Sequence, residues 1–90
     1  MSLYPFHIHC QRIDKARNMA RFYALSIETD LFGEVAVVRR WGRIGTVGGE
    51  KRDPFTTERE AAGYLLALAR AKLRRGYRPV GDWALQNSHG

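Results

Sequence analysis

The most regular pattern in the chain runs from Val35 to Ile44 and is followed by closely spaced glycines. Successive side chains of a strand point to opposite faces, so this run predicts a strand with two different faces. The face predicted to lie on the core is mostly small or aliphatic and holds Ala36, Val38, Arg40, Gly42 and Ile44. The other face ends in cations and an indole and holds Val35, Val37, Arg39, Trp41 and Arg43. Because Gly42 lacks a side chain, we expect a helix to pack closely against the core face there.

Three further segments, of which the first two alternate in the same way, complete a predicted antiparallel sheet. They span Leu3–Asp14, Arg21–Asp30 and the short, charged Glu50–Phe55. The polar segment between the first two lacks helical periodicity and is predicted to be a loop. Turn residues in Thr29–Glu34 and the glycines after Ile44 predict hairpin connections. A phosphate-binding loop is the less favoured interpretation of those glycines, because no Gly-Lys-Ser/Thr ending and no helix follow directly.

One long helix is predicted from Thr57 to Arg75. Thr57 and Glu60 have the spacing of a capping box, and the residues that follow are rich in alanine and leucine. The apolar positions that recur at helical spacing are Ala62, Leu65, Leu66, Ala69 and Leu73. Gly76 is expected to end the helix. The cations of the last turns, Arg70, Lys72, Arg74 and Arg75, suit either the helix dipole or contact with a ligand.

These elements predict an α+β fold, with an antiparallel sheet of about four strands and one long helix packed across one face. A chain of 90 residues suits one small domain with one core. We therefore assign residues 1–90 to a single domain with a core at about 3–80 and a C-terminal tail at 81–90. Within that tail, Trp83 is expected to anchor the chain to the body of the domain.

The charge balance changes this picture by indicating a class of partner. The formal net charge is +6. Twelve of the fifteen cations are arginine, whose fork binds phosphate with two hydrogen bonds and stacks on rings or bases. This composition favours a polyanionic partner, above all nucleic acid. A basic surface that is merely solvated would have the same number of cations.

Several other classes of function find little support in the residues. Cys10 is the single cysteine, which rules out an internal disulfide, and His7 and His9 point away from it in a strand, so no metal or other cofactor is expected. No nucleophile, base or paired carboxylates stand at catalytic spacing. No apolar run approaches a membrane span and no signal peptide opens the chain. We expect a cytoplasmic, non-enzymatic protein without a membrane partner.

The cation and indole face of the central strand is the best candidate site. Side chains two residues apart on a strand stand about 6–7 Å apart, so Trp41 and Arg43 can reach one ligand together. Trp41 could stack on a ribose or base, while Arg39 and Arg43 neutralise phosphate. Alternatively, Trp41 covers the sheet and the arginines stack on its ring. The residues leave both interpretations open.

Trp41-Gly42-Arg43-Ile44-Gly45 resembles the signature of the WGR domain family. The resemblance extends back through Asn18-Met19-Ala20-Arg21-Phe22-Tyr23 and forward to Phe55, the predicted helix and Gly76-Tyr77. It covers about Arg12 to Val80, and it implies an antiparallel sheet with one helix across it. Well-known members lie within poly(ADP-ribose) polymerases, where the domain binds DNA strand breaks near the 5′ end and relays that binding to the catalytic part.

The resemblance implies specific roles for residues of this chain. Trp41 would meet the sugar–phosphate at a DNA end, and Arg43 would contact phosphate or a neighbouring domain. Asn18 and Arg21 would lie near the terminal phosphate. Tyr77 is a further candidate DNA-binding residue. The sequence contains no catalytic or zinc-finger domain, so it is more similar to short bacterial proteins that consist of this domain alone, and the relay function is not carried over.

The resulting hypothesis is a nucleic-acid-binding module for DNA, including strand ends, that is nucleoid-associated within the cytoplasm. Its candidate DNA-binding residues are Trp41, Arg43, Arg39, Asn18, Arg21 and Tyr77. The competing hypothesis is a protein–protein interaction module, because tryptophan and arginine are also the residue types enriched at interface hot spots.

Overall fold

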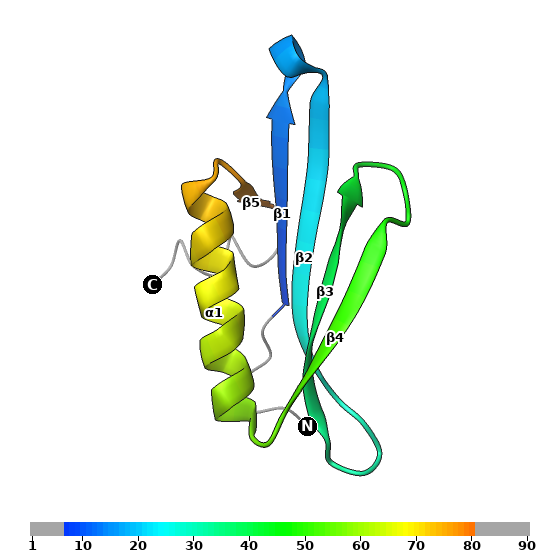
Figure 1. The fold of residues 1–90 in the computed structure, drawn as a ribbon, viewed down its shortest axis with the longest axis vertical. Helices are drawn as coiled ribbons and strands as arrows, with labels where there is room; N and C mark the ends of the chain where they lie inside the picture. Colours follow the sequence, from blue (N-terminus) through cyan, green and yellow to red (C-terminus); the bar gives the residue numbers. More distant parts are fainter. Residues whose placement is uncertain (1–6, 81–90) are drawn as a thin grey trace.

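A computed structural model describes residues 7–80 of the chain, which form a five-stranded antiparallel sheet with one helix across one face (Figure 1). In chain order the elements are β1 (His7–Asp14), the 3₁₀ helix η1 (Lys15–Arg17), β2 (Met19–Thr29), β3 (Val35–Arg43), β4 (Gly49–Phe55), α1 (Glu58–Arg74) and β5 (Arg78–Val80). The strands lie in the order β4-β3-β2-β1-β5, and every neighbouring pair is antiparallel. The predicted α+β class is confirmed.

Two details of the predicted sheet need correction. The sheet has five strands instead of about four, because Arg78–Val80 returns beside β1 and pairs with its residues His9 to Gln11. The second strand also begins earlier than predicted, at Met19 instead of Arg21. Residues 3–6 of the predicted first strand and the tail at 81–90, with Trp83, lie outside the described residues.

Both ends of α1 follow the sequence signals. The Thr57 hydroxyl oxygen accepts a hydrogen bond from the Glu60 backbone N–H at 3.2 Å, which satisfies a donor of the first turn. At the other end, Gly76 adopts a φ of +95° and its N–H donates to the Leu73 carbonyl at 3.1 Å. The Tyr77 N–H then donates to the Lys72 carbonyl at 3.1 Å. This left-handed glycine stop turns the chain back toward the sheet, where β5 begins.

The helix packs on the face of β3 that was predicted to be free of it. The core joins Val35 and Val37 to Leu65 of the helix and to Leu25 and Ile8 of the neighbouring strands. These are strand residues of the same face as Trp41. A side chain at Gly42 would instead meet the Gly48 backbone and the Phe22 and Thr46 side chains, so this glycine admits no helix. The prediction was wrong because Ala36 and Val38 are as apolar as the two valines, and all four are buried.

The helix covers only part of that face. Figure 1 shows the β1–β2 hairpin, with η1 at its tip, reaching well beyond the C-terminal end of α1. The two valines of β3 on this face pack against the helix, whereas Trp41 and Arg43, at the other end of the strand, are exposed. This division leaves the candidate site at the open end of the sheet.

Candidate nucleic-acid interface

Three arginines stand in a row across the open end of the sheet. In the strand register, Arg12 of β1 lies opposite Arg21 of β2, and Arg21 lies opposite Arg43 of β3. Directly opposed residues share one face, so all three side chains emerge on the helix side. Among residues 7–80, no carboxylate forms an ion pair with any of them. Like charges directly opposite each other destabilise a sheet, and a bound anion would relieve that repulsion.

A hollow of about 430 Å³, here called the arginine hollow, opens beside this row. Its side-chain lining includes Arg17, Asn18, Arg21, Trp41, Arg43, Lys72 and Tyr77. Four of these residues are cations and none is acidic. The structure thus brings together five of the six predicted site residues, from β2, β3 and the segments that follow η1 and α1. The sixth, Arg39, does not line this hollow.

The indole of Trp41 is fixed in place but still accessible. Its side chain is not covered by the helix, and the residue remains 41% exposed. A Cβ at Gly49 of β4 would lie 2.8 Å from the Trp41 Cζ2 atom, so the ring rests directly against this glycine. The cation–π contacts found within residues 7–80 do not involve Trp41. Its ring is therefore available to stack on a ligand, and arginines do not occupy it.

The turn after β1 positions Asn18 beside Arg43. Asp14 accepts a hydrogen bond from the Ala16 N–H at 3.1 Å, and Asn18 ends the 3₁₀ turn in the left-handed conformation, with φ 51° and ψ 43°. The Arg43 Nη1 atom donates to the Asn18 carbonyl at 3.4 Å. This contact ties the hairpin tip to β3 and leaves most of the donors of the guanidinium free for an anion.

Lys72, for which the sequence left the helix dipole and ligand contact as alternatives, lines the arginine hollow. Its Nζ atom lies 4.4 Å from the ring centre of Tyr23 and 5.2 Å from that of Tyr77, whose rings meet edge to face. Burial lowers the pKa of this ammonium, and the positive charges of Arg75, Arg21 and Arg39 lower it further. The sequence did contain an indication of this role. Lys72 lies seven residues after Leu65, where a lysine interrupts the apolar stripe of the helix.

Arg39 differs from the other predicted site residues because it has an internal partner. Its side chain is 20% exposed, and its Nε atom lies 3.0 Å from Asp53 Oδ2 of β4, an ion pair that lacks the alignment of a hydrogen bond. Burial acts to lower the pKa of this guanidinium, but the Tyr23 hydroxyl and the Asp53 charge outweigh burial and raise it. Arg39 is thus held by an internal partner, four residues before Arg43 on β3, with Trp41 between them on the same face.

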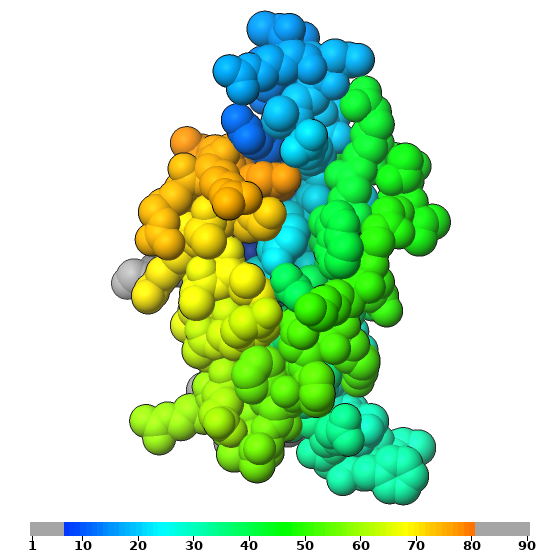
Figure 2. All heavy atoms as spheres, viewed as in Figure 1, coloured from blue at the N-terminus to red at the C-terminus, as the bar shows by residue number. Residues whose placement is uncertain are grey.

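A second hollow of about 390 Å³, here called the helix hollow, lies between α1 and the sheet. It is lined by Tyr23, Arg39, Trp41, Leu68, Ala71, Lys72 and Arg75. In Figure 2, cyan atoms of β2 are visible between the yellow and orange end of the helix and the green strands. Trp41 and Lys72 line both hollows, so the two are adjacent.

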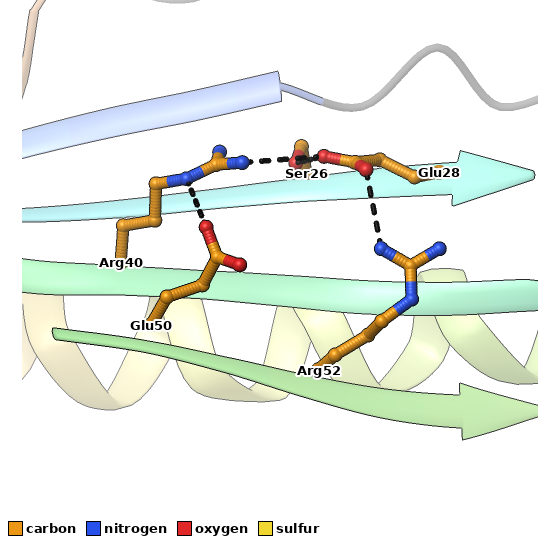
Figure 3. A network of polar contacts seen from close by, with 5 residues as sticks. All are labelled: Ser26, Glu28, Arg40, Glu50 and Arg52. Carbon is orange, nitrogen blue, oxygen red and sulfur yellow. Dashed lines mark hydrogen bonds and ion pairs between the residues drawn. The ribbon is translucent and has the colours of Figure 1, made fainter.

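The opposite face of the sheet presents its arginines differently. Figure 3 shows Arg40 between Glu50 and Glu28, with Nε 2.8 Å from Glu50 Oε1 and Nη2 3.6 Å from Glu28 Oε2. The second oxygen of Glu28 lies 3.3 Å from Arg52 Nη1, and Ser26 donates a hydrogen bond to Glu28. This network neutralises its cations internally, so this face offers little to a polyanion.

The described residues show few features of other chemistries. Within residues 7–80, no group of three histidine, cysteine or acidic side chains is placed to hold a metal ion. Burial raises the pKa of the Cys10 thiol, which keeps it in its unreactive protonated form. No helix in this part of the chain is long and apolar enough to cross a membrane.

Comparison with known proteins agrees with the sequence signature. The WGR domain model matches residues 6–83. The uncharacterized protein y4dW of Sinorhizobium fredii (strain NBRC 101917 / NGR234) is 48% identical over 75 residues, which cover 83% of this chain and 37% of that relative. The chain therefore spans well under half of the length of the curated relative it matches. No solved structure matched. The family match extends over most of the chain, and the protein therefore belongs to the WGR domain family.

Proposed function

We propose that this domain is a nucleic-acid-binding module that holds the sugar–phosphate backbone of DNA, at strand ends in particular, in the arginine hollow. The observation that carries the proposal is the row of Arg12, Arg21 and Arg43, which repel one another and lack acidic partners among the described residues. Bidentate arginine contacts are the strongest common way to hold phosphate. Trp41 stands beside the row with an exposed ring suited to a ribose or base.

The arrangement of cations around the hollow supports binding of a ligand and not its catalytic conversion. The cations that line the hollow come from β2, β3, η1 and the C-terminal end of α1, so phosphate contacts would fix the position of the backbone. Burial and the positive charges of Arg75, Arg21 and Arg39 lower the pKa of Lys72, and these nearby cations support an anionic ligand. A phosphate placed there would stabilise the ammonium and raise its pKa back toward the usual value.

Fluorescence anisotropy with nicked, blunt and 5′-phosphorylated duplexes tests the proposal. If about four to six phosphates are neutralised, the logarithm of the affinity should fall against the logarithm of the salt concentration with a slope near −4 to −5. Trp41→Ala and Arg43→Ala should each weaken binding roughly tenfold.

Arg59→Ala is the matched control, because Arg59 is exposed in the first turn of α1 and makes the same change in net charge outside both hollows. It should bind nearly as well as the wild type. Equally weak binding by the wild type, Trp41→Ala and Arg43→Ala would mean that only nonspecific electrostatic attraction holds the duplex. That result would contradict the proposal.

A further inference from the structure

The helix hollow differs in chemistry from the arginine hollow beside it. Leu68 and Ala71 form an apolar wall on the helix, and Trp41 and Tyr23 contribute aromatic rings from the sheet. Cations stand around these walls, and no carboxylate lines the hollow. An apolar and aromatic slot with a few polar groups at its edge is the general form of a site for a flat organic ring.

The polar groups of this hollow are held by the protein itself. Arg39 is fixed by Asp53, and the Tyr23 hydroxyl interacts with Arg39 while its ring is buried under Lys72. Burial raises the pKa of Tyr23, so its hydroxyl stays neutral. These fixed groups can form hydrogen bonds with the polar edge of a ring. Arg75, at the helix end, is exposed and can bind a negatively charged group.

The size of the hollow limits the ligand. A volume of about 390 Å³ lies near the lower end of the range for small-molecule sites. One nucleobase with its sugar would fill it, and a stacked duplex would not enter. Because Trp41 and Lys72 belong to both hollows, a ligand in the helix hollow would be continuous with a phosphate in the arginine hollow.

We propose that the helix hollow receives the base of one unpaired nucleotide at the 5′ end of a duplex, while the arginine hollow holds its phosphate. This inference rests on the proposed function and adds a substrate class to it: a strand end with an overhanging nucleotide. A paired base would first have to leave the stack, which costs free energy, whereas an unpaired terminal base enters without that cost. The structure thus favours overhanging ends over blunt ends.

The experiment compares three 5′-phosphorylated duplexes by fluorescence anisotropy at fixed salt. One duplex is blunt, one carries a single unpaired 5′ adenine nucleotide, and one carries an abasic nucleotide in its place. The abasic end keeps the extra phosphate and lacks the base, so it separates stacking from charge. The wild type should bind the adenine end about tenfold more tightly than either other end.

Two variants of α1 locate the effect. Ala71→Leu fills the helix hollow from the helix side, and Ala67→Leu makes the same change at an exposed position one turn earlier, outside both hollows. Both substitutions keep a strong helix former, and thermal unfolding checks that both variants fold. Ala71→Leu should lose the preference for the adenine end and keep its affinity for the blunt end. Ala67→Leu should keep both.

The outcomes distinguish this inference from the proposed function. A tenfold preference that Ala71→Leu removes and Ala67→Leu retains would support the base site. Equal binding of adenine and abasic ends by the wild type would overturn the base site while leaving backbone binding intact. A preference that survives in Ala71→Leu would also overturn it, because the base would then lie elsewhere. If no duplex showed salt-dependent binding, both proposals would fall.

Discussion

The two faces of the sheet differ in how the arginines at their exposed ends are paired. On one face, Arg40 and Arg52 lie between carboxylates and form a closed network (Figure 3). On the other, Arg12, Arg21 and Arg43 oppose one another and have no ion-pair partner among residues 7–80. Exposed ion pairs contribute little to stability, so the network's main effect is to remove free charge. The position of unpaired charge, more than the net charge of +6, therefore marks the candidate interface.

The largest effect expected from a change outside the arginines is at Gly49. In Gly49→Ala, the new Cβ would lie within about 3 Å of the Trp41 ring, so the indole must move. Displacing a stacking ring should weaken binding to a 5′-phosphorylated duplex roughly tenfold. Anisotropy titrations measure the loss.

Gly63→Ala is the matched control, because a Cβ there would meet nothing within 4 Å. It should leave binding unchanged and, in the middle of α1, raise the free energy of unfolding by about 0.5–1 kcal/mol. Unchanged binding in Gly49→Ala would show that the position of the indole does not matter to the ligand.

A smaller effect, on stability alone, is expected on the network face. Arg40→Ala removes two ion pairs from a half-exposed side chain, and this should lower the free energy of unfolding by about 1 kcal/mol or less. Urea unfolding gives the free energy, and duplex binding should stay within about twofold of the wild type. A tenfold loss of affinity would mean that this face also contacts nucleic acid, and the contrast between the faces would disappear.

The smallest effect is a pH dependence at Lys72. The folded pKa of this ammonium lies below its usual value of 10.5 because of burial and nearby cations. In the pH range between the folded and the usual pKa, the unfolded chain binds more protons, so the lysine's contribution to stability becomes more favourable as the pH rises. At pH 7 to 8, Lys72→Met should therefore be at least as stable as the wild type.

The comparison is made by thermal unfolding of both proteins at several pH values. Any stability advantage of Lys72→Met should shrink as the pH approaches 10.5, since the wild-type ammonium is by then partly neutral in the folded state. At pH values below the folded pKa of Lys72, the same variant should bind duplexes more weakly. An advantage that grew with pH would contradict the direction of the pKa shift.

Much of the fold could be predicted from local patterns. Alternation predicted the strands that correspond to β1, β2 and β3, and the Thr57 and Glu60 spacing identified the start of α1. The pairing of Trp41 with Arg43 also follows from strand period alone. These features depend on residues that are close in sequence, which is why the sequence was enough to find them.

The features that escaped prediction depend on contacts between distant segments. The arginine row exists only through the strand register, which brings Arg12 within the same line as Arg43. Arg39 was predicted to face a ligand, and its partner Asp53 comes from the next strand. The side of β3 that the helix covers was ambiguous because both faces of its first half are apolar. A three-residue strand such as β5 carries too few positions for alternation to reveal it.

The most direct measurement is the salt dependence of duplex binding in two variants of equal net charge. One replaces Arg12, Arg21 and Arg43 by alanine, and the other replaces Arg40, Arg52 and Arg59. Each arginine that contacts a phosphate adds about −0.9 to the slope of log affinity against log salt. The account predicts a slope near −1 to −2 for the first variant and the wild-type slope of −4 to −5 for the second. An equal change of slope in both variants would contradict it.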